Sequence, residues 1–150
     1  MPQPTCPLCR DRTQGLALWQ NPELRIIDAA DSNFPGFTRV VWHDHVAEMT
    51  QLNGPERRHI MDVVWVVEQV QRDVLLPHKV NLAAFGNQVP HLHWHVIPRW
   101  TTDSHYPDSY WSPAPARSAE QQQEWETQRA EIASLVPTYH TILREALESM

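Results

Sequence analysis

Between Pro90 and Pro98, three histidines alternate with large apolar residues, and this pattern constrains the fold more than any other in the chain: His91, His93 and His95. Strict alternation has the period of a half-buried strand. We therefore expect the three imidazoles to project from one face and the apolar side chains between them to be buried on the other. The flanking prolines cannot donate to a ladder, so they mark the expected ends of the strand.

Three imidazoles on one strand face indicate chemistry as well as structure. Alternate residues of a strand lie about 6.6 Å apart along its axis, so their side chains can converge on one small group, an anion or a metal ion. A neutral imidazole titrates near pH 6.5 and can serve as nucleophile, general base, general acid or ligand. The alternative interpretation is a solvated polar face.

Length and charge exclude several classes of protein. The 150 residues suffice for one domain with a sizeable core, so we expect a single domain over residues 1–150. A net charge of −6 argues against a general nucleic-acid or anionic-membrane surface. A phosphate ligand would therefore have to be held locally. No apolar run reaches the length of a membrane span, and the start lacks the parts of a signal peptide, so we expect a cytoplasmic protein.

The remaining patterns predict an α+β domain with an antiparallel sheet of about five strands and covering helices. Strands are expected at residues 15–19, 24–28, 38–42 and 79–85, and a short helix near Leu52 precedes a long one that begins at Pro55. Residues 101–117 are polar, aromatic and proline-rich, as in a surface loop that could overhang the site. In the extension over residues 101–150, Ser118 opens a polar helix that Pro137 is expected to interrupt before a terminal amphipathic helix.

Cys6 and Cys9 have the spacing of a zinc knuckle in the N-terminal turn, residues 1–14. Two cysteines form no disulfide framework, so a reducing compartment and a metal or redox role are expected. No second cysteine pair exists to complete a four-cysteine site, and histidines would have to complete it. Free cysteines in a turn are the alternative.

The segment from His91 to Ile97 resembles the His-x-His-x-His-x-x signature of the histidine triad nucleotide hydrolases and transferases. Residues 79–89 resemble the strand and phosphate-binding loop that precede the triad in that family, and the resemblance extends over residues 16–99. It implies a histidine-triad-like fold and transfer of a nucleotidyl group from a purine nucleotide to water.

The resemblance also implies roles for the triad. His93 would attack the α-phosphorus and form a covalent intermediate, and His95 would hydrogen-bond the leaving atom and help its departure as an acid. His91 would either orient the nucleophile or ligate zinc. No catalytic metal is required. The loop residues Asn87, Gln88 and Val89 would present N–H groups and amides to the phosphate.

Other expectations come from the same resemblance. A structural zinc would be held by Cys6, Cys9, His45 and His91, with His43 as a substitute for His45. Asp28 or Asp31 would contact the ribose, although either could be a turn aspartate. Asn81 would touch the phosphate or be a satisfied polar group in the sheet. Phe37 departs from the family pattern, which often has a histidine there, and this hints at a different substrate or a more apolar base pocket.

Family dimers pair through the long helix and the strand beside it, so we expect a homodimer that buries part of the Trp65 surface. The substrate class would be nucleoside phosphoramidates or dinucleoside polyphosphates. Two rival functions stay open. In one, the three histidines bind a catalytic zinc. In the other, the protein binds a mononucleotide without turnover.

Overall fold

The computed structural model describes residues 1–11 and 17–150. One antiparallel sheet has the strand order β1-β2-β3-β5-β4, so β1 and β4 are its edges. The strands are β1 (Ala17–Gln20), β2 (Leu24–Asp28), β3 (Thr38–Trp42), β4 (Lys79–Ala83) and β5 (His93–Arg99). The predicted five-stranded antiparallel α+β architecture is confirmed. Residues 15 and 16 of the first expected strand lie outside the described residues.

Four helices complete the described part of the chain: α1 (Pro7–Arg10), the 3₁₀ helix η1 (Met49–Gln51), α2 (Gly54–Val74) and α3 (Ala119–Glu148). The start of α2 is fixed by reciprocal side-chain caps. The Asn53 side chain accepts a bond from the Glu56 N–H, and the Glu56 carboxylate accepts one from the Asn53 N–H. Ser118 and Gln121 cap α3 in the same way.

The expected break at Pro137 is wrong, because α3 is one continuous helix. Proline lacks an N–H and crowds the carbonyl four residues earlier, which is Ala133 here. Both residues are exposed, so the Ala133 carbonyl can turn toward water. The buried residues of α3 recur at helical spacing through the proline, and their packing holds the helix together: Trp125, Ile132, Tyr139, Leu143 and Leu147.

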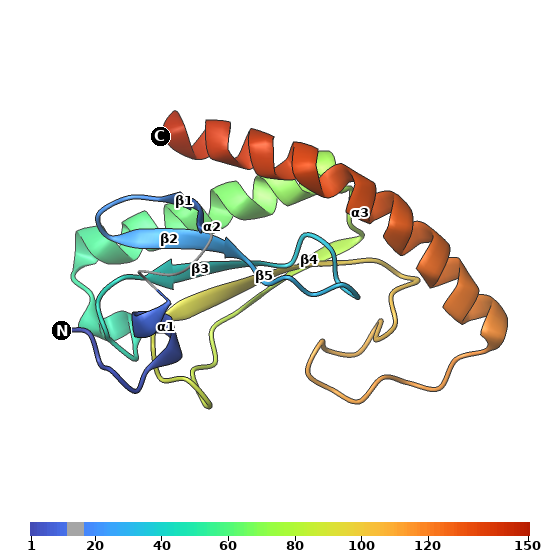
Figure 1. Cartoon of the computed structure of the whole chain (residues 1–150), viewed down its shortest axis with the longest axis horizontal. Helices are drawn as coiled ribbons and strands as arrows, with labels where there is room; N and C mark the ends of the chain where they lie inside the picture. Colours follow the sequence, from blue (N-terminus) through green and yellow to red (C-terminus); the bar gives the residue numbers. More distant parts are fainter. Residues whose placement is uncertain (12–16) are drawn as a thin grey trace.

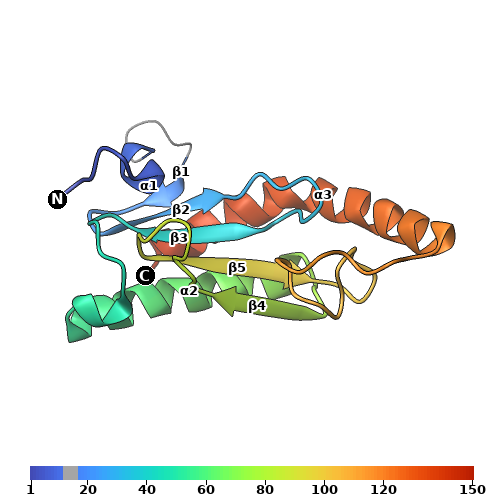
Figure 2. The ribbon, with the colours of Figure 1, turned by 90° about the horizontal axis from the view of Figure 1, so that it is seen from below.

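The two faces of the sheet are covered differently. Helices α2 and α3 lie along one face, called here the helix-covered face (Figure 1). Apolar side chains from the strands and from α2 are fully buried there, among them Leu24, Ile26, Val40, Val96, Ile60, Val63, Val64 and Val67. In Figure 2 the sheet is seen in front of α3, with β4 at the edge beside α2. No described helix is long and apolar enough to cross a membrane.

A buried glutamine fastens α2 to the sheet. The Gln71 amide donates to the carbonyl oxygens of Gly36 and Val96, each at 2.9 Å. Gly36 has a φ of +84°, and a Cβ there would come within 2.4 Å of Leu75 on the helix side. Only glycine suits both the backbone angle and this close approach. The turn before β3 is therefore fixed by packing against α2.

The opposite face, called here the open face, carries irregular segments. Helix α1, the segment between β4 and β5, and the loop of residues 100–118 all lie on this side of the sheet (Figure 1). The predicted loop after β5 is confirmed, since no helix or strand occurs between Arg99 and Ala119.

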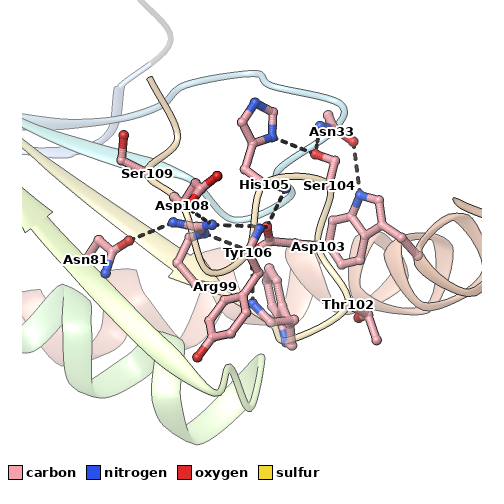
Figure 3. Close-up of polar contacts among 12 residues, drawn as sticks. Asn33, Asn81, Arg99, Thr102, Asp103, Ser104, His105, Tyr106, Asp108 and Ser109 are labelled. Carbon is pink, nitrogen blue, oxygen red and sulfur yellow. Dashed lines mark hydrogen bonds and ion pairs between the residues drawn. The ribbon is translucent and has the colours of Figure 1, made fainter. Parts of the chain in front are cut away.

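Arg99, at the end of β5, holds that loop against the sheet (Figure 3). Its guanidinium is almost fully buried and donates to the Asp103 carboxylate at 2.8 and 3.1 Å, to the Asp108 carbonyl and to the Asn81 side chain. A forked pair of this kind fixes both partners. Asp103 in turn accepts bonds from the backbone N–H groups of His105 and Tyr106. The loop is thereby placed so that Tyr110 and Trp111 reach the open face.

Candidate active site

The triad histidines lie in two environments. Strand β5 runs from His93 to Arg99, so His91 precedes it and Pro98 lies inside it. The expectations that all three imidazoles project from one strand face and that the prolines mark its ends are therefore wrong. The His91 ring is fully buried and turns toward Cys6 and Cys9. His93 and His95 remain on the open face and line a shared cavity, with ring centroids 4.7 Å apart. Burial of His91 also lowers the pKa of its imidazole.

His93 is oriented by a backbone bond. Its Nδ1 lies 2.6 Å from the His91 carbonyl oxygen, so Nδ1 carries the proton and donates, and Nε2 is left with a lone pair. Desolvation lowers the pKa of His93, and the nearby positive charge of Arg39 lowers it further. A neutral, oriented imidazole with a free Nε2 is the form that a nitrogen nucleophile needs.

His95 lies two residues after His93 on the same face of β5, opposite Arg39 of β3, and is 7% exposed. Desolvation, together with the charges of His93 and Arg39, lowers the pKa of its imidazole to about 4. The ring is therefore neutral at pH 7. Its Nδ1 is buried and has no hydrogen-bond partner among the described residues. A buried ring nitrogen without a partner calls for an explanation, and a ligand in the adjoining cavity would provide one.

The cavity has a volume of about 530 Å³, which is within the usual range for small-molecule sites. Besides the two histidines it is lined by α1, β3, the loop before the triad and the long loop: Pro7, Leu8, Asp11, Arg39, Phe85, Gly86, Asn87, Gln88, Val89 and Trp111. The predicted loop residues Asn87, Gln88 and Val89 thus meet His93 and His95. A second, more open groove along the start of α3 is lined by polar and acidic side chains and carries no histidine.

Aromatic rings and one guanidinium complete the cavity wall. Trp111 packs edge-on against Phe85 and His95, with centroid distances of 4.5 and 5.0 Å. Phe37 is buried beside His95 at 5.7 Å, and the Arg39 guanidinium lies over the Phe37 ring at 5.3 Å. Phe37 therefore supports a cation next to the two histidines.

The cysteines and two histidines form a group with the composition of a tetrahedral zinc site. One ligand atom each from Cys6, Cys9, His45 and His91 lies within 4.8 Å of all the others. The Cys9 Sγ lies 3.3 Å from the His45 Nδ1 and 3.4 Å from the His91 Nδ1, and the Cys6 Sγ lies 3.5 Å from the latter. Tetrahedral bonds of about 2.3 Å to sulfur and 2.0 Å to nitrogen require an S···N edge of about 3.5 Å.

Further contacts orient these ligands. The His91 Nε2 bonds to the Trp42 carbonyl oxygen at 2.6 Å, which leaves its Nδ1 facing the thiols. His43 bonds instead to the Pro22 carbonyl oxygen and does not belong to the group. The residues therefore fit a structural Zn²⁺. Of the three triad histidines only His91 belongs to a metal-competent group among the described residues, which does not support the catalytic-zinc rival.

Three predicted polar residues lie outside the cavity lining. The Asp28 carboxylate pairs with His140 of α3 at 3.2 Å and accepts from the Ala30 N–H, and the His140 bond lowers the pKa of Asp28. Asp31 accepts a 2.6 Å bond from the Tyr110 hydroxyl. Asn81 accepts from Arg99. All three have partners, and their nucleotide contacts stay predictions.

Sequence reasoning missed several lining residues. Arg39 left a signal, because it is the one charged residue of β3 and has the parity of the triad once the two strands are paired. Phe85 and Trp111 left only a compositional hint of aromatic segments. Pro7, Leu8 and Asp11 reach the site through tertiary packing of α1, and no local pattern marks them.

Comparisons with known proteins agree with this geometry. The model of the HIT domain family matches residues 12–102. Two curated relatives from Mycobacterium tuberculosis strains CDC 1551 / Oshkosh and ATCC 25618 / H37Rv, both described as AP-4-A phosphorylase, are 32% identical over 78 residues. The match covers 48% of this chain and 40% of either relative, so the chain matches less than half of their length.

Solved structures show the same fold. A histidine triad protein from Bradyrhizobium japonicum superimposes with a TM-score of 0.62 at 24% identity, covering 83% of this chain and 94% of that one. A HIT family protein from Bacillus subtilis gives 0.61 at 17%, covering 85% and 96%. Because the family model spans more than half of the residues, and two of the three motif histidines line the cavity, this chain belongs to the HIT domain family.

Proposed function

We propose that the protein is a nucleotide hydrolase, a phosphoramidase or a dinucleoside polyphosphate hydrolase, that works through a covalent nucleotidyl intermediate on His93. The observation that carries the proposal is the bond from His93 Nδ1 to the His91 carbonyl oxygen, which leaves a neutral Nε2 at a nucleotide-sized cavity. Membership in the HIT family supports a nucleotide-processing enzyme. AP-4-A, in the name of the curated relatives, belongs to the second substrate class.

In the first step the Nε2 lone pair of His93 attacks the α-phosphorus. A P–N bond forms as the bond from phosphorus to the leaving group breaks, and the leaving group takes a proton from His95, which gains that proton from solvent when substrate binds. In the second step water attacks the same phosphorus, the P–N bond breaks, and the water proton is released as His93 regains its neutral form. Dividing the displacement in two lets a positioned side chain replace water in the harder step.

His95 acts on the leaving atom. Because its pKa is about 4 in the free protein, His95 arrives neutral and offers one N–H as a hydrogen-bond donor. Bound phosphate brings negative charge next to the ring and raises this pKa, so that His95 becomes a competent proton donor only when substrate is present. The loop of Asn87, Gln88 and Val89 surrounds the phosphoryl oxygens.

A zinc ion held by Cys6, Cys9, His45 and His91 would be structural in this scheme. Bound there, it would join the N-terminal turn to the segment that begins β5. The His91 side chain then ligates metal while its carbonyl orients His93. The two duties considered for His91 are in this way divided between its side chain and its backbone.

We also propose a homodimer. Trp65 on α2 is 56% exposed, and Leu82 on the edge strand β4 is 37% exposed. Large apolar side chains at a sheet edge and on the neighbouring helix are suited to a second copy of the chain.

The direct test is hydrolysis of an adenosine phosphoramidate and of a diadenosine polyphosphate, alongside a binding titration with AMP. Wild-type protein should turn over at least one of them, and His93→Ala should lose activity by a factor of about 10³ or more while AMP still binds. His59→Ala is the matched control, because His59 is a partly exposed histidine on α2 that does not line the cavity. Binding of AMP without turnover of either substrate would favour the rival nucleotide-binding protein.

A further inference from the structure

Arg39 is a cation at the cavity that the transfer scheme above does not use. It lies on β3 directly opposite His95 in the strand register. Side chains paired in this way start from Cβ atoms about 4.5–5.5 Å apart on the same face. The guanidinium therefore shares the cavity wall with both His93 and His95.

No carboxylate neutralises this cation in the described part of the chain. The ion pairs found there are made by His59, Arg99 and His140. The Arg39 guanidinium instead lies over the apolar ring of Phe37, and its Nε is buried without a hydrogen-bond partner. A buried charged donor without a partner is costly and calls for an explanation such as a ligand.

Arg99, on the same face, provides the contrast. Its buried guanidinium is satisfied by Asp103, Asn81 and the Asp108 carbonyl (Figure 3). Arg99 is a structural arginine with its donors in use. Arg39 has the same chemistry with donors left over, and it points at the cavity instead of at a loop.

We propose that Arg39 binds the phosphoryl group on which His93 acts, by directing its guanidinium fork at the non-bridging oxygens. This inference rests on the proposed nucleotidyl transfer. The planar fork matches two phosphate oxygens and stays charged at every working pH. Arg39 supplies at the cavity wall the fixed positive charge that a chain of net charge −6 must provide locally.

The position of Arg39 also bears on the substrate. A fixed cation beside the attacked phosphorus favours a group that carries full negative charge on its non-bridging oxygens, as in a nucleoside monophosphate or polyphosphate. Adenosine, which has no phosphate, gains nothing from Arg39. Nucleotide and nucleoside therefore form a matched pair of probes.

The test titrates AMP, adenosine and inorganic phosphate into wild type, Arg39→Gln, Arg39→Lys and Arg58→Gln. Arg58 is an exposed arginine of α2, so its variant controls for the loss of one charge. We expect Arg39→Gln to weaken AMP binding about 10- to 100-fold, the range of a charge-assisted bond. Adenosine binding should not change. Arg39→Lys should recover part of the loss, because it keeps the charge and loses the fork.

Added salt gives a readout that a purely structural role would not affect. AMP affinity of the wild type should fall as salt is raised, and that of Arg39→Gln should fall much less. If Arg39→Gln does not fold, Arg39→Lys carries the test, with weaker AMP binding and unchanged adenosine binding as the expected result.

Three results would overturn the inference: unchanged AMP binding by Arg39→Gln, equal weakening of AMP and adenosine, or wild-type protein that binds neither AMP nor phosphate. Failure of the proposed function looks different. Wild type would then bind AMP and phosphate through Arg39 and still turn over no nucleotide. That result would support the anion site at Arg39 and refute the proposed enzymatic activity.

Discussion

The helix-covered face and the open face of the sheet are built from the same strands, but the first forms the apolar core and the second carries the cavity. On β5, Trp94 and Val96 point to the helices, while His93 and His95 point to the cavity. The first set is held by apolar packing against α2 and α3, and the second is surrounded by loops, rings and a cation. Alternation along one strand therefore places the stabilising apolar side chains on one face and the reactive histidines on the other. A register slip of one residue would exchange the two sets of side chains.

A charge buried on the helix-covered face should destabilise the protein more than any other change considered. Val64 of α2 is fully buried, and Val64→Asp should reduce the free energy of unfolding by about 3–5 kcal/mol, because the carboxylate has no partner there. Urea denaturation measures this loss. Arg58→Asp, on the exposed side of α2, is the control and should change stability little. Equal effects of the two variants would refute the assignment of this face as the core.

Removal of zinc tests how the open face is held at its N-terminal end. Protein purified without added metal should contain about one zinc per chain. Cys9→Ser or a strong chelator should remove it and lower the melting temperature by on the order of 10 °C.

Two histidine variants test whether His45 or His43 is a zinc ligand. His45→Ala should lose the metal, whereas His43→Ala should keep it, because His43 bonds to the Pro22 carbonyl outside the group. If the wild type is purified without metal and Cys9→Ser melts at the same temperature, the two cysteines are free thiols in a turn and do not form a zinc site.

The pH dependence of stability reports the difference between the pKa of His95 in the folded protein and its pKa in the unfolded chain. The pKa of His95 is about 4 in the folded protein, below the ordinary value of 6.5, so between these values the unfolded chain binds more protons. The stabilising contribution is thus complete above pH 6.5 and is lost as pH falls toward 4, by at most about 3 kcal/mol. His95→Gln should flatten this slope in denaturation measured across that range. An unchanged slope would show that the pKa of His95 is the same in the folded and unfolded protein, which would contradict the lowered value.

The smallest effect on folding is expected at the outer surface of α2. Trp65→Glu should leave the monomer's melting behaviour nearly unchanged, because Trp65 is 56% exposed in the single chain. It should nevertheless halve the mass found by sedimentation, from a dimer to 17.4 kDa. A wild-type protein that sediments at 17.4 kDa with full activity would refute the homodimer.

The sequence was most informative where the structure depends on local spacing. The strands at 24–28 and 38–42 and the helix that follows Pro55 occur at the expected places, because alternation and capping are short-range signals. Pro137 misled for a related reason. A local rule predicted a break, while packing of Tyr139, Leu143 and Leu147 against the core keeps α3 continuous.

The site was predicted only in part, because its geometry depends on contacts distant in sequence. The parity of His91 is that of His93, yet tertiary contact with the N-terminal turn moves its ring away from the cavity. The position of Arg39 opposite His95 follows from the pairing of β3 with β5, which are separated in sequence by η1, α2 and β4. Neither fact can be obtained from periodicity alone.

Trapping and mapping the nucleotidyl adduct tests most directly whether His93 is the nucleophile. Protein mixed with a radiolabelled or mass-tagged adenosine phosphoramidate or diadenosine polyphosphate would be quenched with base within one turnover, digested and sequenced by mass spectrometry. We predict an acid-labile, base-stable AMP adduct on His93 that is absent from His93→Ala and accumulates in wild type before product does. An active protein that shows no adduct, or that carries it on His95, would contradict the assignment of His93 as the nucleophile.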